Sequence, residues 1–402
     1  MRTSLGSWQA SAAVVLLFGF NGLVVGSYAA SIPTLTARFG LAPWQLSMLF
    51  VCMGLAAIAS MQVAGRLSDR LGARRVALAM IPVLVVAILA LGLAPTLPAL
   101  FGAAILLGVG NGGIDVSMNA MGVQVEQHRA KPIMSFFHGM WSVGNLIGAT
   151  LLVALAPLFA PDPQPAVVAA TSVTSGLGVA AFLIAWRIAP ETTLVTHTDS
   201  TGARSPIPPA AYLLGLMAIA FGLGEGTAND WSGLHVTEIA GVDPTTGALG
   251  YTCVVAFMVV IRLLGDFLVA RFGRRAVTMF GGACSALGYL LVAVGSGLPI
   301  LLLGWSLVGL GIGMIAPQVY AVAGHTAGGR GLAVVVTFGY ATFLMAPALI
   351  GWLVGTIGIQ KTMFVPALLL SGLLLVARIM PGRGESVVPT AEAEASWTDP
   401  AA

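Results

Sequence analysis

Residues 65–75 read GRLSDRLGARR, and residues 271–275 repeat the core of this pattern as RFGRR. Both segments lie between two long apolar runs. The arginine and glycine positions coincide at a separation of 201 residues, so that Arg70 and Gly72 correspond to Arg271 and Gly273. A pattern that recurs at one long distance indicates a duplicated unit. We therefore expect two similar halves, each with a short basic loop after its second apolar run.

The composition around these loops is that of a membrane protein. Of the 402 residues, 57% are hydrophobic and 8% are charged, whereas soluble domains have about 45–50% and about 25%. One buried core cannot hold so many apolar residues, so most of the chain is expected to contact the lipid bilayer. The composition excludes a soluble enzyme, a nucleic-acid-binding protein and a disordered scaffold.

Apolar stretches long enough to cross a membrane as helices occur twelve times. They are long and continuous, which excludes strands, whose membrane pattern alternates over about ten residues. We predict an all-α, polytopic membrane protein with twelve transmembrane helices in two pseudo-symmetric six-helix bundles. The predicted spans are residues 11–33, 44–64, 76–94, 98–120, 134–156, 166–188, 210–232, 247–268, 276–295, 299–322, 331–355 and 362–380.

Four regions follow from these spans. We predict an N-terminal six-helix bundle over residues 1–188 and a C-terminal six-helix bundle over residues 210–383. Residues 189–209, which form the longest polar stretch before the tail, are predicted to be a cytoplasmic linker. Residues 384–402 are acidic and polar, so we expect a disordered cytoplasmic tail.

The positions of lysine and arginine predict the orientation, because cytoplasmic loops of membrane proteins carry an excess of these residues. With a cytoplasmic N-terminus, only Arg38 and Lys361 face outward, and Arg262 lies inside a span. Both termini are then cytoplasmic, in a bacterial inner membrane. The cationic residues on the cytoplasmic side would be Arg2, Arg66, Arg70, Arg74, Arg75, Arg129, Lys131, Arg187, Arg204, Arg271, Arg274, Arg275, Arg330, Arg378 and Arg383.

The first basic segment resembles the loop motif G-x-L-a-D-r-x-G-r-k of the major facilitator superfamily. The resemblance implies a transporter of two alternating bundles around a central site, and a charge latch at the loop that favours one gating state. Arg262 and Asp266, spaced i, i+4, are interpreted as an ion pair of a second latch. A basic loop that serves topology alone is the alternative. The latch residues predicted in this way are Gly65, Asp69, Arg70, Gly72, Arg74, Arg262, Asp266 and Arg271.

A finer resemblance concerns poorly characterised bacterial members of the superfamily near the fucose permease branch. It is carried by residues 110–119, 135–144, 225–232 and 337–340. These segments read GNGGIDVSMN, SFFHGMWSVG, EGTANDWS and TFGY. The likeness implies the family and the fold, and no particular cargo.

Carboxyl groups inside spans are the candidates for proton coupling, because intramembrane charges usually face a cavity or a partner. Asp115 lies in the fourth span and Glu225 in the seventh, and the resemblance implies that the first, fourth, seventh and tenth spans line the cavity. At 1.5 Å per residue, Asp115 lies about 25 Å from the outer end, at a depth similar to that of His138. We expect Asp115 to carry the proton with His138 as relay, or Glu225 to carry it. A structural hydrogen-bond knot between the fourth and fifth spans is the alternative.

Polar and aromatic side chains on the same spans are the candidates for substrate contact. Helix packing is the alternative for Trp141, and a substrate carboxylate held by Arg262 is the alternative to its ion pair. Trp231, with Asp230 near the outer end of the seventh span, is interpreted as an interfacial anchor and a cap, and a role in the outer gate is the alternative. Besides His138 and Glu225, the predicted substrate-binding residues are Asn21, Asn119, Trp141, Asn145, Gln318 and Tyr340.

We therefore expect a monomeric secondary transporter that takes up a small polar solute, such as a sugar or sugar-like compound, together with protons. Proton-coupled efflux of metabolites or drugs is the first alternative, and a non-transporting sensor or assembly protein is the second. The sequence contains no phosphate-binding loop of the Walker type, so no cofactor and no ATP-driven step are expected. No metal site, enzymatic activity or nucleic-acid partner is expected.

Overall fold

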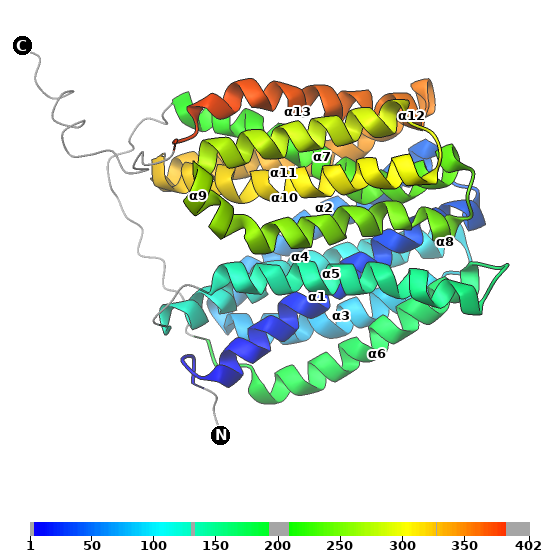
Figure 1. Cartoon of the computed structure of the whole chain (residues 1–402). Coiled ribbons are helices and arrows are strands. Elements are labelled where there is room, and N and C mark those ends of the chain that lie inside the picture. The colour runs from blue at the N-terminus through cyan, green and yellow to red at the C-terminus, as the bar shows by residue number, and fades with distance from the viewer. Residues whose placement is uncertain (1–3, 130–132, 193–208, 327, 383–402) are drawn as a thin grey trace, which may run out of the picture. The chain divides into compact units, whose positions relative to one another are not determined.

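The computed structural model describes residues 4–129, 133–192, 209–326 and 328–382. Every regular element in this part of the chain is a helix, which confirms the all-α prediction (Figure 1). In the first half these elements are α1 (Trp8–Phe39), α2 (Pro43–Leu71), α3 (Ala73–Leu93), α4 (Leu97–Gln127), α5 (Met134–Leu155), η1 (Ala156–Leu158) and α6 (Gln164–Ile188). In the second half they are α7 (Pro209–Ala240), α8 (Pro244–Gly247), α9 (Leu249–Val294), α10 (Leu298–Thr326), α11 (Gly328–Ile357), α12 (Ile359–Thr362), α13 (Phe364–Val376) and η2 (Ala377–Ile379).

Eleven helical segments of the described residues are long and apolar enough to cross a membrane. The eighth and ninth predicted spans are joined in α9, whose 46 residues bend at Gly273, where φ is 82°. The eleventh predicted span corresponds to α11, of which the apolar part Met345–Ile357 is shorter. The last span is built from α12, α13 and η2. The chain is therefore a multi-pass membrane protein.

The helices form two compact units, and each unit contains segments from both halves of the sequence or from separate parts of one half. Unit 1 contains Met1–Ser200 together with Asn229–Val255 and Pro347–Ile359. Unit 2 contains Thr201–Ala228, Ala256–Ala346 and Gln360–Ala402. Most of the predicted linker, residues 193–208, and the predicted tail lie outside the described residues.

Unit 1 is held together by close packing of α1 on α5 (Figure 1). A Cβ atom added at Gly22 would lie 1.9 Å from the Trp141 carbonyl oxygen, and one at Gly144 would lie 2.0 Å from the Gly19 carbonyl oxygen. Membrane helices gain little from burying apolar surface against each other, so close van der Waals approach at small residues drives their packing. The glycines therefore bring the two backbones into direct contact where residues 19–27 of α1 meet residues 141–149 of α5.

Unit 2 uses the same device between α9 and α10. A Cβ atom at Gly311 would lie 2.3 Å from the Gly281 carbonyl oxygen, and one at Gly288 would lie 2.6 Å from the Gly304 carbonyl oxygen. Directly after Gly288 and Gly304 in sequence, Tyr289 packs edge-on against Trp305, with ring centroids 5.5 Å apart. Both aromatic side chains are fully buried.

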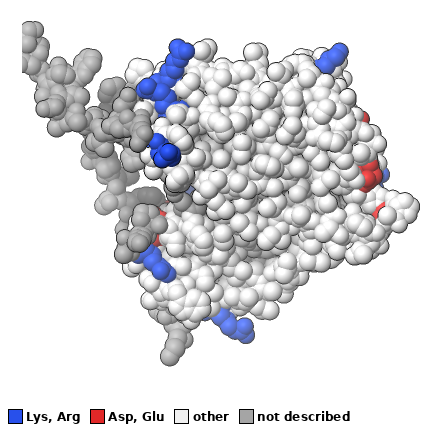
Figure 2. All heavy atoms as spheres, viewed as in Figure 1, with Lys and Arg blue, Asp and Glu red and all other residues white. Residues whose placement is uncertain are grey.

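The described surface is mostly uncharged. Figure 2 shows one face on which lysine, arginine, aspartate and glutamate side chains lie at the ends of the helices and none lies across the middle. An uncharged belt around the helix middles is what a hydrocarbon layer about 30 Å thick requires. The candidate sites are therefore sought among the polar groups that lie within the membrane-spanning helices.

Candidate functional site

A chain of hydrogen bonds joins three helices inside unit 1. The Trp141 Nε1 on α5 donates to Asn21 Oδ1 on α1 over 2.6 Å, and Asn21 Nδ2 donates to Asn111 Oδ1 on α4 over 2.8 Å. The Asn21 side chain is only 2% exposed. A buried amide with a bond at each end is held in one orientation. The predicted substrate residues Asn21 and Trp141 are thus brought together, and Asn111 completes the set.

Glycines place this polar chain. Because Gly22 and Gly26 have no side chain, the Trp141 and Asn145 carbonyl oxygens approach the backbone of α1 directly. Asn21 then lies within one hydrogen bond of the Trp141 indole. Close approach of two helices at small residues, with polar groups bonded across the contact, is typical of membrane bundles.

Asp115 and Asn119 lie one turn apart on α4, as their spacing predicts. Asn119 Nδ2 donates to the Asp115 carbonyl oxygen over 2.8 Å and to its carboxylate Oδ1 over 3.3 Å. Asp115 is partly buried. The structure therefore gives the predicted coupling carboxyl a neutral hydrogen-bond donor on its own helix.

His138 lies on α5 and packs edge-on against Phe18 of α1, with ring centroids 5.1 Å apart. Its side chain is exposed to solvent or lipid, whereas Phe18 is fully buried. The described contacts place His138 against α1 and Asp115 against Asn119. The relay between Asp115 and His138 stays a prediction.

Asn145 forms a second polar contact on α5. Its Oδ1 accepts a 2.8 Å hydrogen bond from the Tyr251 hydroxyl at the start of α9, and both side chains are buried in unit 1. Tyr251 was missed by the sequence analysis. The only available signal was a phenol hydroxyl inside an apolar run, since a buried Tyr usually finds a hydrogen-bond partner.

Trp231 was interpreted as an interfacial anchor, and this interpretation is wrong. Its side chain is 0% exposed and packs edge-on against Phe50 of α2, with ring centroids 6.1 Å apart. Both residues belong to unit 1. An interfacial anchor keeps one edge of the ring in the headgroup layer, which a fully buried indole cannot do.

In unit 2, Glu225 on α7 pairs with Arg262 on α9. Arg262 Nη2 lies 3.5 Å from Glu225 Oε1, and the two side chains are 23% and 14% exposed, respectively. The sequence analysis had paired Arg262 with Asp266, whose side chain lies outside the described set. Glu225 remains in a continuous helix, and its neighbour Gly224 accepts a hydrogen bond from the Tyr289 hydroxyl.

Two further predicted substrate residues lie elsewhere or are not described. Gln318 Oε1 accepts a 2.6 Å hydrogen bond from Arg274 Nη1, which ties α10 to the basic loop of unit 2. The Tyr340 side chain lies outside the described set, although α11 itself is described there. Gln318 therefore contacts the basic loop of unit 2, and its role in substrate binding stays a prediction.

The predicted latch residues of the first loop lie at the end of α2 and the start of α3, with Gly72 between the two helices. Gly72 has a φ of 89°, and Arg74 Nη1 lies 3.0 Å from Glu191 Oε1. Arg74 Nη2 also donates to the Trp186 carbonyl oxygen at the end of α6 over 2.8 Å. Gly65 and Asp69 are half-buried, Arg70 is exposed, and Arg271 in the second loop lies over the Phe272 ring.

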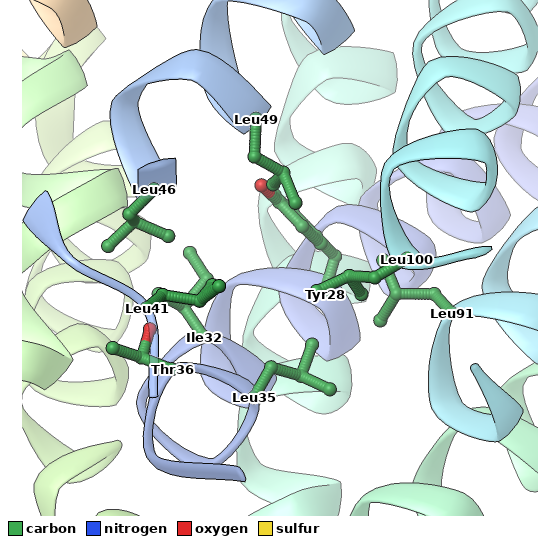
Figure 3. Close-up of a pocket in the computed structure, with 9 residues that line it drawn as sticks. All are labelled: Tyr28, Ile32, Leu35, Thr36, Leu41, Leu46, Leu49, Leu91 and Leu100. Carbon is green, nitrogen blue, oxygen red and sulfur yellow. The ribbon is translucent and has the colours of Figure 1, made fainter. Parts of the chain in front are cut away.

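A small hollow with room for about one water molecule lies at one end of unit 1 (Figure 3). Two side chains of its lining carry hydroxyls, Tyr28 and Thr36, and the rest is aliphatic. Ligand pockets usually measure about 300–1,000 Å³ and carry convergent polar groups. We therefore place the candidate site at the Asn21 network and at the Glu225–Arg262 pair rather than in this hollow. Among the described residues, no group of three His, Cys, Asp or Glu side chains could hold a metal ion.

Comparisons with known proteins agree with this architecture. The model of the Major Facilitator Superfamily matches residues 14–224 and 214–401. The uncharacterized transporter y4wD of Sinorhizobium fredii is 35% identical over 386 residues, which cover 94% of this chain and 100% of the relative. An uncharacterized MFS-type transporter of Yersinia pestis is 30% identical over 369 residues, or 90% and 94% of the two chains.

Among solved structures, a mutant of the nucleoside transporter NupG superposes with a TM-score of 0.71. The superposition covers 91% of this chain and 99% of that chain at 12% sequence identity. A likeness at this identity concerns the fold alone. The fold is therefore shared with a transporter whose cargo says nothing about the present one.

Proposed function

Because the chain belongs to the Major Facilitator Superfamily, we propose that it takes up a small polar solute together with protons by alternating access. It is a multi-pass membrane transporter and not an enzyme. We infer that it resides in a bacterial inner membrane with both termini in the cytoplasm, since the basic loops after α2 and within α9 then lie on the cytoplasmic side. A sugar-like solute is the class that we favour, because of the amide and indole groups in the hydrogen-bond chain of unit 1.

The hydrogen-bond chain from Trp141 through Asn21 to Asn111 is the observation that carries the proposal. It offers amide donors and acceptors beside an indole ring in the interior of unit 1. Sugars present hydroxyls that exchange hydrogen bonds with amides, and an apolar ring face that packs on an aromatic side chain. When no solute is bound, these amide and indole groups satisfy part of one another's hydrogen-bonding capacity.

Proton coupling is assigned to Asp115 and Glu225. Both carboxyl groups lie in membrane-spanning helices, where an isolated charge costs about 2.5–3.5 kcal/mol on insertion scales. Each has a partner that accommodates the ionised form, Asn119 for Asp115 and Arg262 for Glu225. A carboxyl that gains and loses a proton as its surroundings change can link the proton gradient to solute movement.

The first experiment is a thermal-stability screen of the purified chain against a metabolite library at pH 5.5 and 7.5. A ligand at 100 times its dissociation constant stabilises a protein by about 2.7 kcal/mol, which such a screen detects. A polar hit is then followed as a labelled solute in liposomes, with an imposed pH gradient of either sign. Accumulation against the solute gradient when the outside is acidic supports uptake; accumulation with the reverse gradient would assign efflux.

Site variants separate coupling from binding in the same liposomes. We expect Asp115→Asn and Glu225→Gln to lose pH-driven accumulation, and Trp141→Phe, which lacks the indole donor, to raise the solute concentration required for half-maximal exchange. Asp162→Asn, in the connection before α6, is the matched control. Unchanged accumulation in both carboxyl variants would refute the coupling assignment.

A further inference from the structure

The hydrogen-bond chain of unit 1 has a fixed direction. The indole nitrogen of Trp141 carries a donor and no acceptor, so the Asn21 oxygen has to face it. The Asn21 amino group then points to α4, where it requires an acceptor, and the Asn111 oxygen provides one over 2.8 Å. The oxygen and the nitrogen of an amide are similar in shape, so the partners decide which way the amide lies. Trp141 therefore orients both Asn21 and Asn111.

The chain ends at the amino group of Asn111. Among the residues that the structure describes, none accepts a hydrogen bond from Asn111 Nδ2, and this nitrogen is not sealed from its surroundings. Asn111 is half-buried, whereas Asn21 is only 2% exposed. Because the Asn111 oxygen is turned toward Asn21, the group within reach of a solute consists of two N–H donors.

The packing of α4 shows that this amino group lies inside the unit. A Cβ atom at Gly112 would lie 2.2 Å from the Ala57 carbonyl oxygen of α2, and one at Gly110 would lie 2.8 Å from the Leu84 side chain of α3. Asn111 is bonded toward α1. Its side chain therefore points to other helices of unit 1 and not to lipid.

We propose that Asn111 determines the specificity of the site, and that its amino group donates a hydrogen bond to an uncharged carbonyl oxygen of the solute. This inference rests on the proposed function and narrows its substrate class to sugar-like solutes that carry a carbonyl group, of which the N-acetylated amino sugars are an example. Trp141 and Asn21 are positioning residues in this site, because they act on the solute through Asn111.

The chemistry of the chain favours a carbonyl over other groups. An ammonium group carries donors only and would face the Asn111 donors without an acceptor. A carboxylate would meet no counter-charge in the chain, whose three side chains are uncharged, and burial of an unpaired charge is costly. Asp115, one turn along α4, would also repel it. A site built around a buried donor rejects solutes without the matching acceptor, because the donor is left unpaired.

Matched sugars test the proposal with the full-length protein in detergent at pH 5.5. N-acetyl-D-glucosamine, N-acetyl-D-galactosamine and N-acetyl-D-mannosamine are each compared with the parent sugar, which has a hydroxyl at the same carbon, and with the amino sugar, which has an ammonium group. Thermal midpoints are measured against rising solute concentration. We expect at least one acetylated sugar to have a dissociation constant at least tenfold below those of its two counterparts, which corresponds to about 1.4 kcal/mol.

Variants of the chain assign this preference to one side chain. Asn111→Leu removes the amino group at a similar volume, so the three sugars of a set should bind alike. Asn111→Asp keeps an oxygen for the Asn21 amino group and replaces the donor by an acceptor, so the acetylated sugar should lose its advantage. Gln127→Glu, at the exposed end of the same helix, is the control for the change from amide to carboxylate.

Trp141→Phe tests the positioning role. Without the indole donor, Asn21 can lie either way, and Asn111 can then present its oxygen as well as its amino group. The ratio of the dissociation constants within a set should therefore fall toward one. A merely structural role of the indole would weaken the binding of all three sugars alike and leave this ratio unchanged.

The outcomes are distinct. A preference for acetylated sugars that disappears in Asn111→Leu supports the proposal. The absence of a preference in all three sets overturns it, and so does a preference that persists in Asn111→Leu, which would arise from contacts of the acetyl methyl group. Tighter binding of the amino sugars would place the solute on Asp115 and also overturn it.

The proposed function fails by a different measurement. The sugar comparison reads binding and not flux, so a loss of proton-driven accumulation in liposomes would contradict the proposed function and leave the preference of Asn111 intact. Accumulation of a solute without a carbonyl group, together with equal binding within each set, would contradict the role of Asn111 alone.

Discussion

Arg74 and Arg275, which lie 201 residues apart, make the same contact in their respective halves. Arg74 Nη2 donates to the Trp186 carbonyl oxygen over 2.8 Å, and Arg275 Nε donates to the Met380 carbonyl oxygen over 2.7 Å. Each carbonyl lies at the end of the sixth span of its half. In each half, the basic loop is thus hydrogen-bonded to the end of the sixth span. The repeat in the sequence therefore corresponds to a repeated hydrogen bond.

The glycine of each loop is expected to be required by its backbone. Gly72 and Gly273 have φ values of 89° and 82°, where a residue with a Cβ atom is strained by about 1–2 kcal/mol. We expect Gly273→Ala to lower the free energy of unfolding by about this amount. Gly72→Ala should cost more, because its Cβ would also lie 2.9 Å from Thr192 Oγ1.

Thermal midpoints in detergent check this prediction. Gly265→Ala is the control, since its Cβ would meet no atom within 4 Å and its helical φ suits alanine. A midpoint for Gly273→Ala equal to that of the control would contradict the argument from strain.

The contact between α1 and α5 gives a second prediction. A Cβ atom at Gly22 would lie 1.9 Å from the Trp141 carbonyl oxygen, and backbone atoms cannot turn aside as a flexible side chain can. Gly22→Ala must therefore separate the helices, and we expect a loss of about 1–3 kcal/mol, typical of overpacking. Gly176→Ala on α6 is the control, since nothing lies within 4 Å of its Cβ position.

Solute exchange provides a second readout for the same variant. Separating α1 from α5 lengthens the bond between Asn21 and Trp141, so Gly22→Ala should weaken solute binding more than Gly176→Ala does. Normal binding in a destabilised Gly22→Ala protein would place the solute away from this network.

Much of the fold could be predicted from the sequence, because hydrophobic length and the repeated loop are local signals. The twelve predicted stretches correspond to helices, although α9 runs through two of them across Gly273. The candidate site was predictable in part. Asn21, Asn119 and Trp141 stand out as polar or aromatic residues in apolar runs, and Asn21 and Trp141 do meet.

Partners across helices could not be predicted, since they depend on how helices are rotated and spaced. The pair of Arg262 with Asp266 at i+4 stays a prediction, because the Asp266 side chain lies outside the described set. Nothing in the sequence indicated that Glu225 of another helix lies beside Arg262. Trp231 lies near the end of its predicted span, which is where interfacial anchors occur. Only the structure shows that it packs against Phe50 instead. Tyr251 has no distinguishing neighbour in sequence at all.

The bond between Asn145 and Tyr251 gives a third prediction. Tyr251→Phe removes the hydroxyl and leaves Asn145 Oδ1 buried without this donor. Leaving a buried acceptor unsatisfied costs about 1–3 kcal/mol, so the thermal midpoint should fall. The double variant Asn145→Leu with Tyr251→Phe is the partner experiment, because replacing both groups removes the unsatisfied atom. If the loss of stability in the double variant equals the sum of the losses in Asn145→Leu and Tyr251→Phe, the bond contributes nothing to stability.

Asp243 gives a prediction about pH, since it caps α8 outside the membrane-spanning segments. Partial burial acts to raise the pKa of Asp243, but hydrogen bonds from the side chains and backbone N–H groups of Thr245 and Thr246 outweigh burial and lower it. A depressed pKa in the folded state means that the cap stabilises the protein above the unfolded value of about 3.9. This contribution is lost as the pH falls through the folded value.

Thermal midpoints between pH 3 and pH 7 measure the effect. We expect Asp243→Ala to be less stable than the wild type at pH 7 and the difference to shrink as the pH falls below about 4. Asp243→Ser keeps a capping oxygen that does not titrate, so its difference from the wild type should change with pH while its difference from Asp243→Ala stays constant. A constant gap between wild type and Asp243→Ala across this range would contradict the assignment.

The glycine seam between α1 and α5 also bears on how such a transporter changes its cargo during evolution. The seam is formed by the Cα atoms of Gly22 and Gly26 against the main-chain oxygens of Trp141 and Asn145, so the helix spacing is independent of the side chains at 141 and 145. Substitutions there alter the chemistry that a solute meets and leave the scaffold in register. Single replacements at positions 141 and 145 can therefore change selectivity, whereas a replacement of a seam glycine would move the helices themselves.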